Sequence, residues 1–290
     1  MVTDLKIYIS PNLEKKTCLE YMHKACDILL SQGCQLYADE SIKNELCLKS
    51  ATYGDPDEMV SMCDYILVVG GDGTILRHAK RFAKHNKAIL GLNSGRLGFM
   101  ATLEHDEIEQ LKDFCEGRFT VSKRMMLKAV AQLENGQTKE FTALNDVVFS
   151  KGTGCKIADF VVEKNESVIT ALRADGLIFS TPTGATAYSL SAGGPLIEPQ
   201  LDCIEFTQIC PHSLFARSMI FSPDSEISVC YNAATNPHVT VEVDGVAELK
   251  LTPGDKVRIM RSENEVKLID ITGSSFYDLV NMKLIKPLKD

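Results

Sequence analysis

Residues 65 to 74, YILVVGGDGT, constrain the fold more than any other stretch of the sequence. Five apolar or aromatic residues precede a turn with three glycines, and residues 74 to 85 then carry apolar side chains at helical spacing. This order of buried strand, glycine turn and helix is typical of a βαβ unit. We therefore expect the first part of the chain to form an α/β domain.

The same alternation extends to both sides of this stretch. We expect strands at Leu5 to Ser10, Cys34 to Tyr37, 65 to 69 and Ala88 to Leu92, and helices at Leu13 to Ser31, Pro56 to Cys63, 74 to 85 and 105 to 116. Gly33 follows the first of these helices, where a glycine commonly ends a helix. Strands separated by helices predict a mainly parallel, Rossmann-like sheet with right-handed crossovers.

The pattern changes near Gly117, after which β-type runs dominate. These runs are Met125 to Leu133, Phe141 to Ser150, Lys156 to Glu163, Leu177 to Ser180 and Ile227 to Val229. His238 to Val243 and Val246 to Leu251 flank Asp244-Gly245, a favoured hairpin turn. The main helical interruption is Gly184 to Ala192. This part of the sequence predicts a second, β-rich domain.

Charge and composition exclude several classes of protein. The formal net charge of -8 argues against nucleic acid or an anionic lipid surface as a partner. No run approaches the ~18 apolar residues that a membrane-spanning helix needs. The N-terminal residues lack the pattern of a secretory signal, so we expect a cytoplasmic protein without membrane association.

Metal-binding patterns are also missing from the sequence. The ten cysteines include no C-x-x-C pair, and the six histidines show neither H-x-x-x-H nor H-x-x-H spacing. A structural zinc site or a histidine-based metal site is therefore not expected.

The VVGGDGT loop matches neither of the two standard phosphate loops. It contains no G-x-x-x-x-G-K-[ST] motif, and Leu76 stands where the third glycine of a dinucleotide fingerprint would fall. Its backbone can still approach an anion at a helix N-terminus. Asp72 has two interpretations, a capping or turn residue and an acceptor for a reacting hydroxyl, and the residues alone leave both open.

A second loop of similar kind, NSGRLGF at 93 to 99, follows the next predicted strand. Ligands of open α/β sheets bind at the carboxyl ends of the strands, so two neighbouring glycine loops predict one crevice. Arg96 is either a phosphate contact or a solvated loop residue. Phe99 either stacks on a base or packs in a core.

In the β-rich part, three polar stretches stand out. Asn145-Asp146 within an apolar run can read a base or a ribose, or simply form a bend. RADG at 173 to 176 precedes STPTGATAYSLSAGGP at 180 to 195, where hydroxyl groups gather at the start of a short helix. Those hydroxyl groups can hold a polar ligand, although capping alone needs only one of them.

Taken together, these motifs closely resemble those of the NAD kinase family. They occur in order along the chain: GGDGT at 70 to 74, GLNSGRLGF at 91 to 99, the Asn-Asp pair at 145 and 146, RADG at 173 to 176 and STPTGATAY at 180 to 188. The last is the most specific, because GGDG also occurs in diacylglycerol-type lipid kinases and has relatives in phosphofructokinases. Residues 10 to 60 match least well.

The resemblance implies ATP-dependent phosphorylation of the 2′-hydroxyl of the adenosine ribose of NAD, giving NADP, with a divalent metal that is usually Mg. It implies an α/β domain, residues 1–117 plus about 272–290, and an all-β sandwich domain, residues 118–271. The C-terminal segment, Phe276 to Ile285, would return to the first domain. Family members assemble as dimers and tetramers, so we expect a homodimer or homotetramer with NAD and ATP as its ligands.

The resemblance also assigns roles to residues. Asp72 would be the base or hydroxyl-orienting group, and Gly70, Gly71 and Gly73 would form the phosphate loop. The residues that would contact NAD are Gly73, Arg77, Phe99, Asn145, Asp146, Lys156, Arg173, Asp175, Thr183, Thr186, Ala187, Tyr188, Ser189, Ser191, Cys210 and Gly245. The family often has Asn-Glu at 145 and 146, so the shorter Asp146 is a departure, and no metal ligands are assigned.

Two other functions fit part of the pattern. A lipid or other small-alcohol kinase can use the same GGDG loop, but the TPTGATAY segment and the lack of a basic or amphipathic stretch count against it. A non-catalytic dinucleotide-binding module would need the binding residues without Asp72 as a reacting group.

Overall fold

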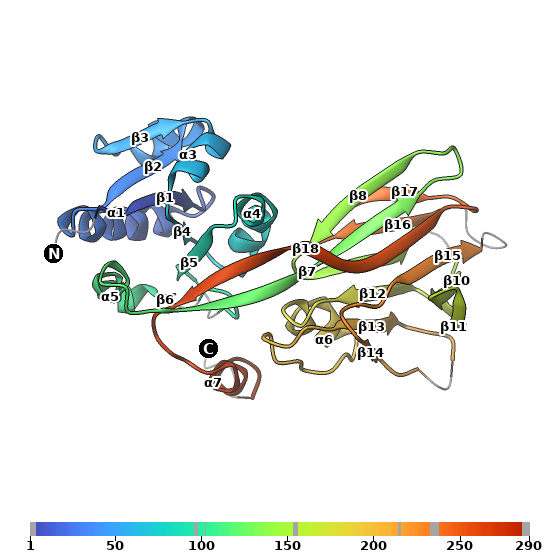
Figure 1. The fold of residues 1–290 in the computed structure, drawn as a ribbon. Helices are drawn as coiled ribbons and strands as arrows, with labels where there is room; N and C mark the ends of the chain where they lie inside the picture. The colour runs from blue at the N-terminus through green and yellow to red at the C-terminus, as the bar shows by residue number, and fades with distance from the viewer. Residues whose placement is uncertain are drawn as a thin grey trace. The chain divides into compact units, whose positions relative to one another are not determined.

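The computed structural model describes residues 4–95, 98–101, 103–152, 156–213, 216–232 and 238–285. The chain divides into two compact units (Figure 1). Unit 1 comprises Met1–Lys123 and Val266–Asp290, and unit 2 comprises Arg124–Glu265. Two long strands, β7 (Thr120–Gln132) and β18 (Lys256–Asp270), cross the division along the chain.

Unit 1 contains a parallel sheet whose strand order is β3-β2-β1-β4-β5. The strands are β1 (Lys6–Pro11), β2 (Gln35–Asp39), β3 (Ala51–Gly54), β4 (Tyr65–Val69) and β5 (Ala88–Asn93). The short β6 (Leu103–Glu104) and the last part of β18 both pair with β5. The chain order reverses between β1 and β4, which is the point where ligands bind in doubly wound sheets.

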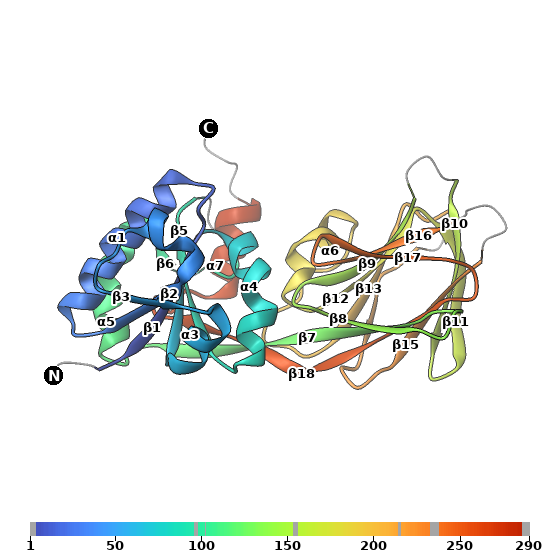
Figure 2. The ribbon, with the colours of Figure 1, turned by 90° about the horizontal axis from the view of Figure 1, so that it is seen from above.

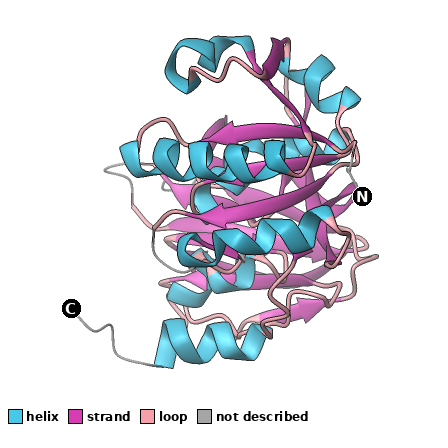
Figure 3. Ribbon diagram, turned by 90° about the vertical axis from the view of Figure 1, so that its left-hand side faces the viewer, coloured by secondary structure: helices cyan, strands magenta, loops and turns pink. Residues whose placement is uncertain are grey.

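Helices cover both faces of this sheet (Figure 2). α1 (Lys16–Ser31) and α5 (Leu111–Cys115) share a core with Ile7, Leu67 and other apolar strand residues. On the other face lie α3 (Pro56–Met62) and α4 (Asp72–Lys84), and Phe82 of α4 packs edge-on against Tyr8. Figure 3 distinguishes these helices from the strands by colour. Two-sided burial explains why the strands are apolar runs without alternation.

Three further short helices lie in the described part of unit 1 before β7. They are η1 (Glu40–Ile42), α2 (Lys43–Leu46) and the 3-10 helix η2 (His105–Gln110), which runs directly into α5. The helix expected at 105 to 116 is therefore a 3-10 turn followed by a short α-helix. The helix expected at 74 to 85 begins two residues earlier, so that Asp72 is its first residue.

Unit 2 is built from antiparallel sheets. One has the order β14-β13-β12-β9-β16-β17. Its strands are β14 (Met219–Phe221), β13 (Ile204–Ile209), β12 (Gly176–Ser180), β9 (Asp146–Lys151), β16 (Val239–Val243) and β17 (Val246–Leu251). The hairpin expected around Asp244-Gly245 is confirmed as β16 and β17.

The strands of the other sheet in unit 2 are β11 (Ser167–Ala174), β10 (Ala158–Lys164), β15 (Ile227–Asn232), β18, β7 and β8 (Thr138–Ala143). Both sheets contribute to one hydrophobic core, which includes Phe149 and Phe179 from the first sheet and Phe160 and Ile259 from the second. Two sheets that bury their inner faces together form a sandwich. The predicted fold class is thereby confirmed.

Two sequence predictions in unit 2 need correction. The run expected at Phe141 to Ser150 is two strands, because the chain leaves β8 after Ala143 and enters β9 at Asp146. The helix expected at Gly184 to Ala192 is a 3-10 turn, η3 (Gly184–Thr186), followed by α6 (Tyr188–Ser191). Ala187 interrupts it with φ of -101° and ψ of -120°.

The C-terminal segment belongs to unit 1, as predicted. It forms α7 (Phe276–Val280) and a π-helical turn, η4 (Asn281–Ile285). Leu279 and Val280 pack against Phe99. Within the residues that the structure describes, no helix is long and apolar enough to span a membrane.

The return of β18 to unit 1 predicts the effect of one substitution. Ile269 is fully buried in the core shared with α1 and α5. We expect Ile269→Ala to lower the free energy of unfolding by about 2 to 5 kcal/mol, because it leaves a cavity in that core. Ile220, which is 55% exposed, provides the control. Ile220→Ala should change the free energy of unfolding by less than about 0.5 kcal/mol. Urea unfolding measures both, and equal effects would contradict this assignment.

Candidate active site

The Asp72 carboxylate joins the two glycine loops of unit 1. It accepts hydrogen bonds from the backbone N–H groups of Phe99 at 2.7 Å, Met100 at 3.0 Å and Ala101 at 3.1 Å. Asp72 follows β4, whereas the three donors follow β5. Because these bonds lead away from α4, Asp72 does not act as a cap of its own helix.

These three hydrogen bonds occupy most of the acceptor positions of the Asp72 carboxylate. A carboxylate has about four acceptor positions, two on each oxygen. Oδ1 accepts from Met100 and Ala101, and Oδ2 accepts from Phe99. One position therefore remains, on Oδ2, and the side chain is 25% exposed. Asp72 can accept one hydrogen bond from a ligand while its orientation stays fixed.

The glycines of the two loops serve different purposes. A Cβ at Gly98 would lie 2.1 Å from Oδ1 of Asp72, and one at Gly70 would lie 2.3 Å from Oγ1 of Thr74. Both positions therefore need glycine for packing. A Cβ at Gly71 or Gly73 would meet no described atom within 4 Å. Gly73 lies within the first turn of α4, where glycine is less favourable than alanine by up to about 1 kcal/mol, so packing gives no reason for it.

Lys283, which no sequence motif indicated, lies beside Asp72. Its Nζ is 3.9 Å from Oδ2 of Asp72 and 4.2 Å from the centre of the Phe99 ring. Phe99 also packs against Phe276, and only 9% of the residue is exposed. The described contacts of Phe99 are packing contacts with the C-terminal segment.

The loop after β1 completes this edge of the sheet. The N–H of Asn12 donates to the carbonyl of Val69, and its side-chain amide donates to Thr74 at 3.4 Å. Arg77 forms an ion pair with Glu14 at 3.5 Å, and both side chains are mostly exposed. Arg96, considered as a phosphate contact, lies outside the described residues.

In unit 2, Asp244 organises the Asn-Asp segment. Its carboxylate accepts from the backbone N–H groups of Leu144 at 3.0 Å, Asn145 at 2.8 Å and Asp146 at 3.3 Å. Asp244 and Gly245 have φ of 51° and 77°, as a type I′ hairpin turn requires. The turn thus accounts for Gly245, and it directs the Asp244 side chain to the segment before β9.

Asn145 connects this segment to the hydroxyl-rich stretch. Its carbonyl accepts from the N–H of Thr181 at 2.9 Å and from the hydroxyl of Ser180 at 3.2 Å. A Cβ at Gly184 would lie 2.2 Å from the same carbonyl. The side-chain Oδ1 of Asn145 is buried and has no hydrogen-bond partner among the described residues. Because buried polar atoms are nearly always hydrogen-bonded, an unpaired acceptor here indicates a position where a ligand can donate a hydrogen bond.

Asp146 is an unusual carboxyl group because it is 5% exposed beside other acids. Burial, followed by the negative charges of Asp244 and Glu242, raises its pKa to about 7. Near neutral pH a substantial fraction of Asp146 is therefore protonated and can donate a hydrogen bond.

Tyr188 shares its surroundings with several of the predicted residues. The residue is 46% exposed, and the partial burial of its phenol, followed by the negative charges of Glu242, Cys210, Asp146 and Asp175, raises its pKa. Three of these charged groups, Asp146, Asp175 and Cys210, are themselves predicted residues. The N–H of Asp175 donates to the carbonyl of Ile209, next to Cys210, at 2.9 Å, so Asp175 and Cys210 share one region of unit 2. Glu242 is the fourth of these charged groups, and the sequence analysis missed it.

Other predicted residues have different partners. Asp175 pairs with Lys151 at 2.6 Å, and Arg173 pairs with Asp159 at 2.5 Å across β10 and β11. Ser189 is fully buried, and its hydroxyl donates to Glu205 at 2.7 Å. We assign Ser189 to this buried network rather than to NAD, because its hydroxyl has no access to a ligand.

The remaining predicted residues lie near the short helices or at the surface. Thr183 is buried, and its carbonyl accepts from the hydroxyl of Thr186 at 3.2 Å. Ala187 is half-buried between η3 and α6, and Ser191 and Lys156 are exposed. Among the described residues, no group of three or more histidine, cysteine or acidic side chains is arranged to hold a metal ion.

Comparison with known proteins identifies the family. The model of the ATP-NAD kinase N-terminal domain matches residues 7–119, and that of the C-terminal domain matches residues 144–271. The chain belongs to the NAD kinase family. The resemblance stated from the sequence motifs is confirmed, and the protein is a phosphotransferase of this family.

Curated NAD kinases align over much of this NAD kinase chain. The NAD kinase of Acetivibrio thermocellus is 37% identical over 281 residues, which is 97% of each chain. That of Symbiobacterium thermophilum is 40% identical over 222 residues, covering 76% of this chain and 78% of the relative.

Solved structures show the same fold. Yeast NADH kinase complexed with NADH has a TM-score of 0.89 at 23% identity, with coverage of 99% of this chain and 89% of that chain. An NAD kinase from Archaeoglobus fulgidus in complex with ATP has a TM-score of 0.67 at 20% identity, and the match covers 96% of each chain.

The raised pKa of Asp146 predicts how stability depends on pH. Between about pH 4 and pH 7 the folded protein keeps a proton that the unfolded chain releases, so this group lowers the free energy of unfolding as pH rises. Asp146→Asn mimics the protonated form. Relative to wild type, the variant should gain stability by an amount that grows on the order of 2 kcal/mol between pH 5 and pH 8.

Urea unfolding at pH 5, 6, 7 and 8 measures this difference. The exposed Asp224 in the same unit provides the control, since Asp224→Asn should show no such trend. A difference between Asp146→Asn and wild type that is constant with pH would contradict the assignment.

Proposed function

We propose that this NAD kinase transfers the γ-phosphoryl group of ATP to the 2′-hydroxyl of the adenosine ribose of NAD, giving NADP, and that Asp72 orients the reacting hydroxyl. The observation that carries the proposal is the Asp72 carboxylate, which three backbone N–H groups fix while one acceptor position on Oδ2 stays available. A hydroxyl that donates to this position is held in a single orientation.

Orientation is the main requirement of this reaction. Phosphoryl transfer passes through a loose transition state in which the attacking and leaving oxygens lie in line, so catalysis depends mostly on positioning and on stabilising charge. The O2′–P bond forms as the bond between Pγ and the bridging oxygen of ATP breaks. The hydroxyl proton moves late to Oδ2 of Asp72, and ADP leaves.

The open backbone at Gly71 and Gly73 supports a role in binding phosphate. Both residues lie at the N-terminal end of α4, a helix of 13 residues. Free N–H groups and the helix dipole favour an anion there, and the absence of side chains lets it approach closely. We assign the phosphates of ATP to this end of the helix, with Gly70 shaping the turn.

The proposed divalent ion, Mg, enters as part of the ATP complex. Mg usually keeps several waters and is held by phosphates plus one or two carboxylates. The described residues contain no group of three candidate ligands, and most of the acceptor capacity of Asp72 is occupied. These residues therefore do not suit a resident metal ion, and we derive no catalytic step through one.

We assign recognition of NAD to unit 2. The unpaired Oδ1 of Asn145 suits the amino group of adenine, and Asp146 suits a ribose or base acceptor when protonated. Tyr188, Asp175 and Cys210 lie around the same region. The other NAD contacts proposed from family resemblance are Gly73, Arg77, Phe99, Lys156, Arg173, Thr183, Thr186, Ala187, Ser191 and Gly245. We further propose a cytoplasmic homodimer or homotetramer.

The proposal predicts that Asp72→Asn separates turnover from binding. The amide retains the shape of the carboxylate but accepts a proton poorly and presents an N–H group on one side. We expect kcat for NADP formation to fall by about 10²-fold or more. Binding of NAD, measured by calorimetry, should change by less than about threefold.

The assay uses purified protein with ATP, Mg and NAD, and follows NADP enzymatically. A variant with full turnover would reject Asp72 as the orienting group. If the wild type makes no NADP but phosphorylates a lipid or another alcohol, the GGDG loop serves a different acceptor. If the wild type binds NAD and transfers nothing, the protein is a non-catalytic binding module.

Gly73→Ala tests the phosphate loop separately from protein stability. Alanine meets no described atom there and favours the helix, so the melting temperature should stay the same or rise by a few degrees. The added methyl group lies where the phosphates approach, so we expect KM for ATP to rise about tenfold or more. Gly136→Ala, at a hairpin turn in unit 2 with φ of 83°, is a control that should destabilise the protein and leave KM for ATP unchanged.

A further inference from the structure

The GGDG loop places a carboxylate beside an anionic substrate and contains no cation of its own. In P-loop proteins a lysine inside the loop reaches the β- and γ-phosphates. Residues 68 to 74, VVGGDGT, include neither lysine nor arginine. A cationic side chain for a phosphoryl group next to Asp72, in addition to the proposed Mg and the N–H groups at the start of α4, therefore has to come from another part of the chain.

The cation nearest to Asp72 among the described ion pairs comes from the C-terminal segment. Lys283 lies in η4, and its Nζ is 3.9 Å from Oδ2 of Asp72. Oδ2 is also the oxygen that retains an acceptor position. The lysine is thus adjacent to the position that the reacting hydroxyl would take.

The structure holds Lys283 near Asp72 without engaging its N–H groups there. A separation of 3.9 Å is longer than a hydrogen bond, so the contact is an ion pair only. The Phe99 ring holds the ammonium group by a cation–π contact, since its centre is 4.2 Å from Nζ. The lysine side chain is 31% exposed, so its N–H groups can turn toward a ligand.

We propose that Lys283 is the phosphoryl-binding cation of this kinase, supplied by the C-terminal segment in place of a P-loop lysine. The inference rests on the proposed function. In the resting enzyme Lys283 balances the charge of Asp72. When ATP binds, its ammonium group donates to the γ-phosphoryl oxygens and stabilises the charge that they carry in the transition state.

The balance of the reaction leaves Lys283 unchanged. The O2′–Pγ bond forms, the bond from Pγ to the bridging oxygen breaks, and ADP takes the bonding electron pair. The proton of the 2′-hydroxyl passes to Asp72 and then to solvent. Lys283 transfers no proton in this reaction and contributes charge and hydrogen bonds only.

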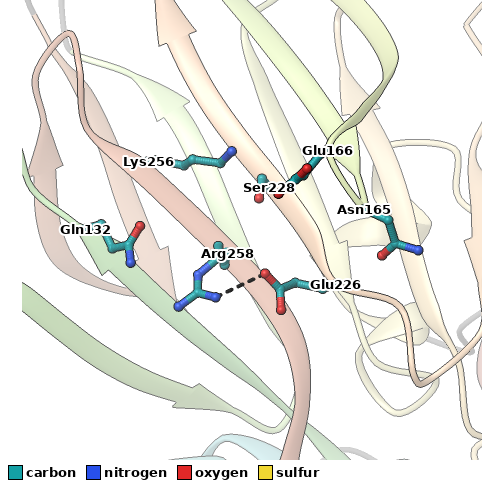
Figure 4. A pocket seen from close by; sticks show the side chains of 7 residues that line it. All are labelled: Gln132, Asn165, Glu166, Glu226, Ser228, Lys256 and Arg258. Carbon is teal, nitrogen blue, oxygen red and sulfur yellow. Dashed lines mark hydrogen bonds and ion pairs between the residues drawn. The ribbon is translucent and has the colours of Figure 1, made fainter.

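A pocket in unit 2 is also lined by cationic side chains, but these are less available to an anion than Lys283. It has a volume of about 460 Å³, and Lys256 and Arg258 line it together with Glu166 and Glu226 (Figure 4). Arg258 pairs with Glu226 at 3.1 Å, and Lys256 pairs with Glu163 at 2.8 Å. Since both cations already have carboxylate partners at hydrogen-bonding distance, an anion would have to displace them.

The test uses Lys283→Met, which keeps the length of the stem and removes the charge. We expect kcat for NADP formation to fall about 10²-fold, the usual cost of removing one donor to a developing anion. The affinity for NAD should stay within about twofold. Lys112→Met is the matched control, because Lys112 forms an exposed ion pair with Glu109 elsewhere in unit 1, and it should retain wild-type kinetics. Lys283→Arg, which keeps the charge, should recover part of the lost rate.

A second measurement separates contact with phosphate from an effect through Asp72. The affinity for ATP with Mg is measured by calorimetry in Asp72→Asn and in the double variant with Lys283→Met. If Lys283 contacts the phosphoryl group, the double variant binds ATP at least tenfold more weakly than Asp72→Asn alone. Equal affinities would show that Lys283 acts only on the Asp72 charge and would overturn the inference.

The outcomes distinguish this inference from the proposed function. Wild-type protein that makes no NADP contradicts the function, whatever the lysine does. Wild-type protein that makes NADP, together with a Lys283→Met variant of normal or raised rate, leaves the function standing and refutes the role of Lys283.

Discussion

The hydrogen bonds from Phe99, Met100 and Ala101 to Asp72 are the constraint on which the site in unit 1 depends. They fix the start of α4 against the loop after β5, and they exclude a side chain at position 98, where a Cβ would meet the carboxylate. They also fix the backbone at Phe99, whose ring supports Lys283 and packs against the C-terminal segment. One carboxylate thus sets the positions of two loops and of the helical segment that returns to them.

In unit 2 a second aspartate, Asp244, also accepts hydrogen bonds from three consecutive backbone N–H groups. These are the groups at 144 to 146, just as Asp72 accepts from those at 99 to 101. In both cases a loop without regular hydrogen bonds is ordered by an aspartate side chain, which accepts from backbone donors that would otherwise be costly to bury. Asp244 differs from Asp72 in that it also affects the protonation of a neighbouring carboxyl group. The charge of Asp244 adds to the burial of Asp146 and raises the pKa of that neighbour, so ordering this loop also sets its protonation.

The sequence was sufficient where the signal is local. The run 65 to 69, the turn at Asp244-Gly245 and Gly33 after the first helix each depend on a few neighbouring residues, and each lies where it was expected. Asp244 as an organiser, Glu242 and Lys283 were missed, because their partners are distant in the chain; Asn145 and Asp244 are 99 residues apart. β18 was missed because the polar residues 262 to 265 interrupt its alternation. The sequence does not distinguish the glycines of the two loops from one another. In the structure a Cβ at Gly70 or Gly98 would clash with a neighbouring side chain, whereas one at Gly71 or Gly73 would meet no described atom within 4 Å.

A carboxylate beside a triphosphate is repelled by it, and the groups around Asp72 reduce that repulsion. Two anions a few ångströms apart repel each other, and a net charge of -8 on the chain adds to that repulsion. Three backbone N–H groups donate to the Asp72 carboxylate and offset part of its negative charge. Lys283 adds a full positive charge on the side of Oδ2 that remains open. In the proposed mechanism, these groups let the Asp72 carboxylate orient a hydroxyl while the phosphoryl group approaches, in a chain that is acidic overall.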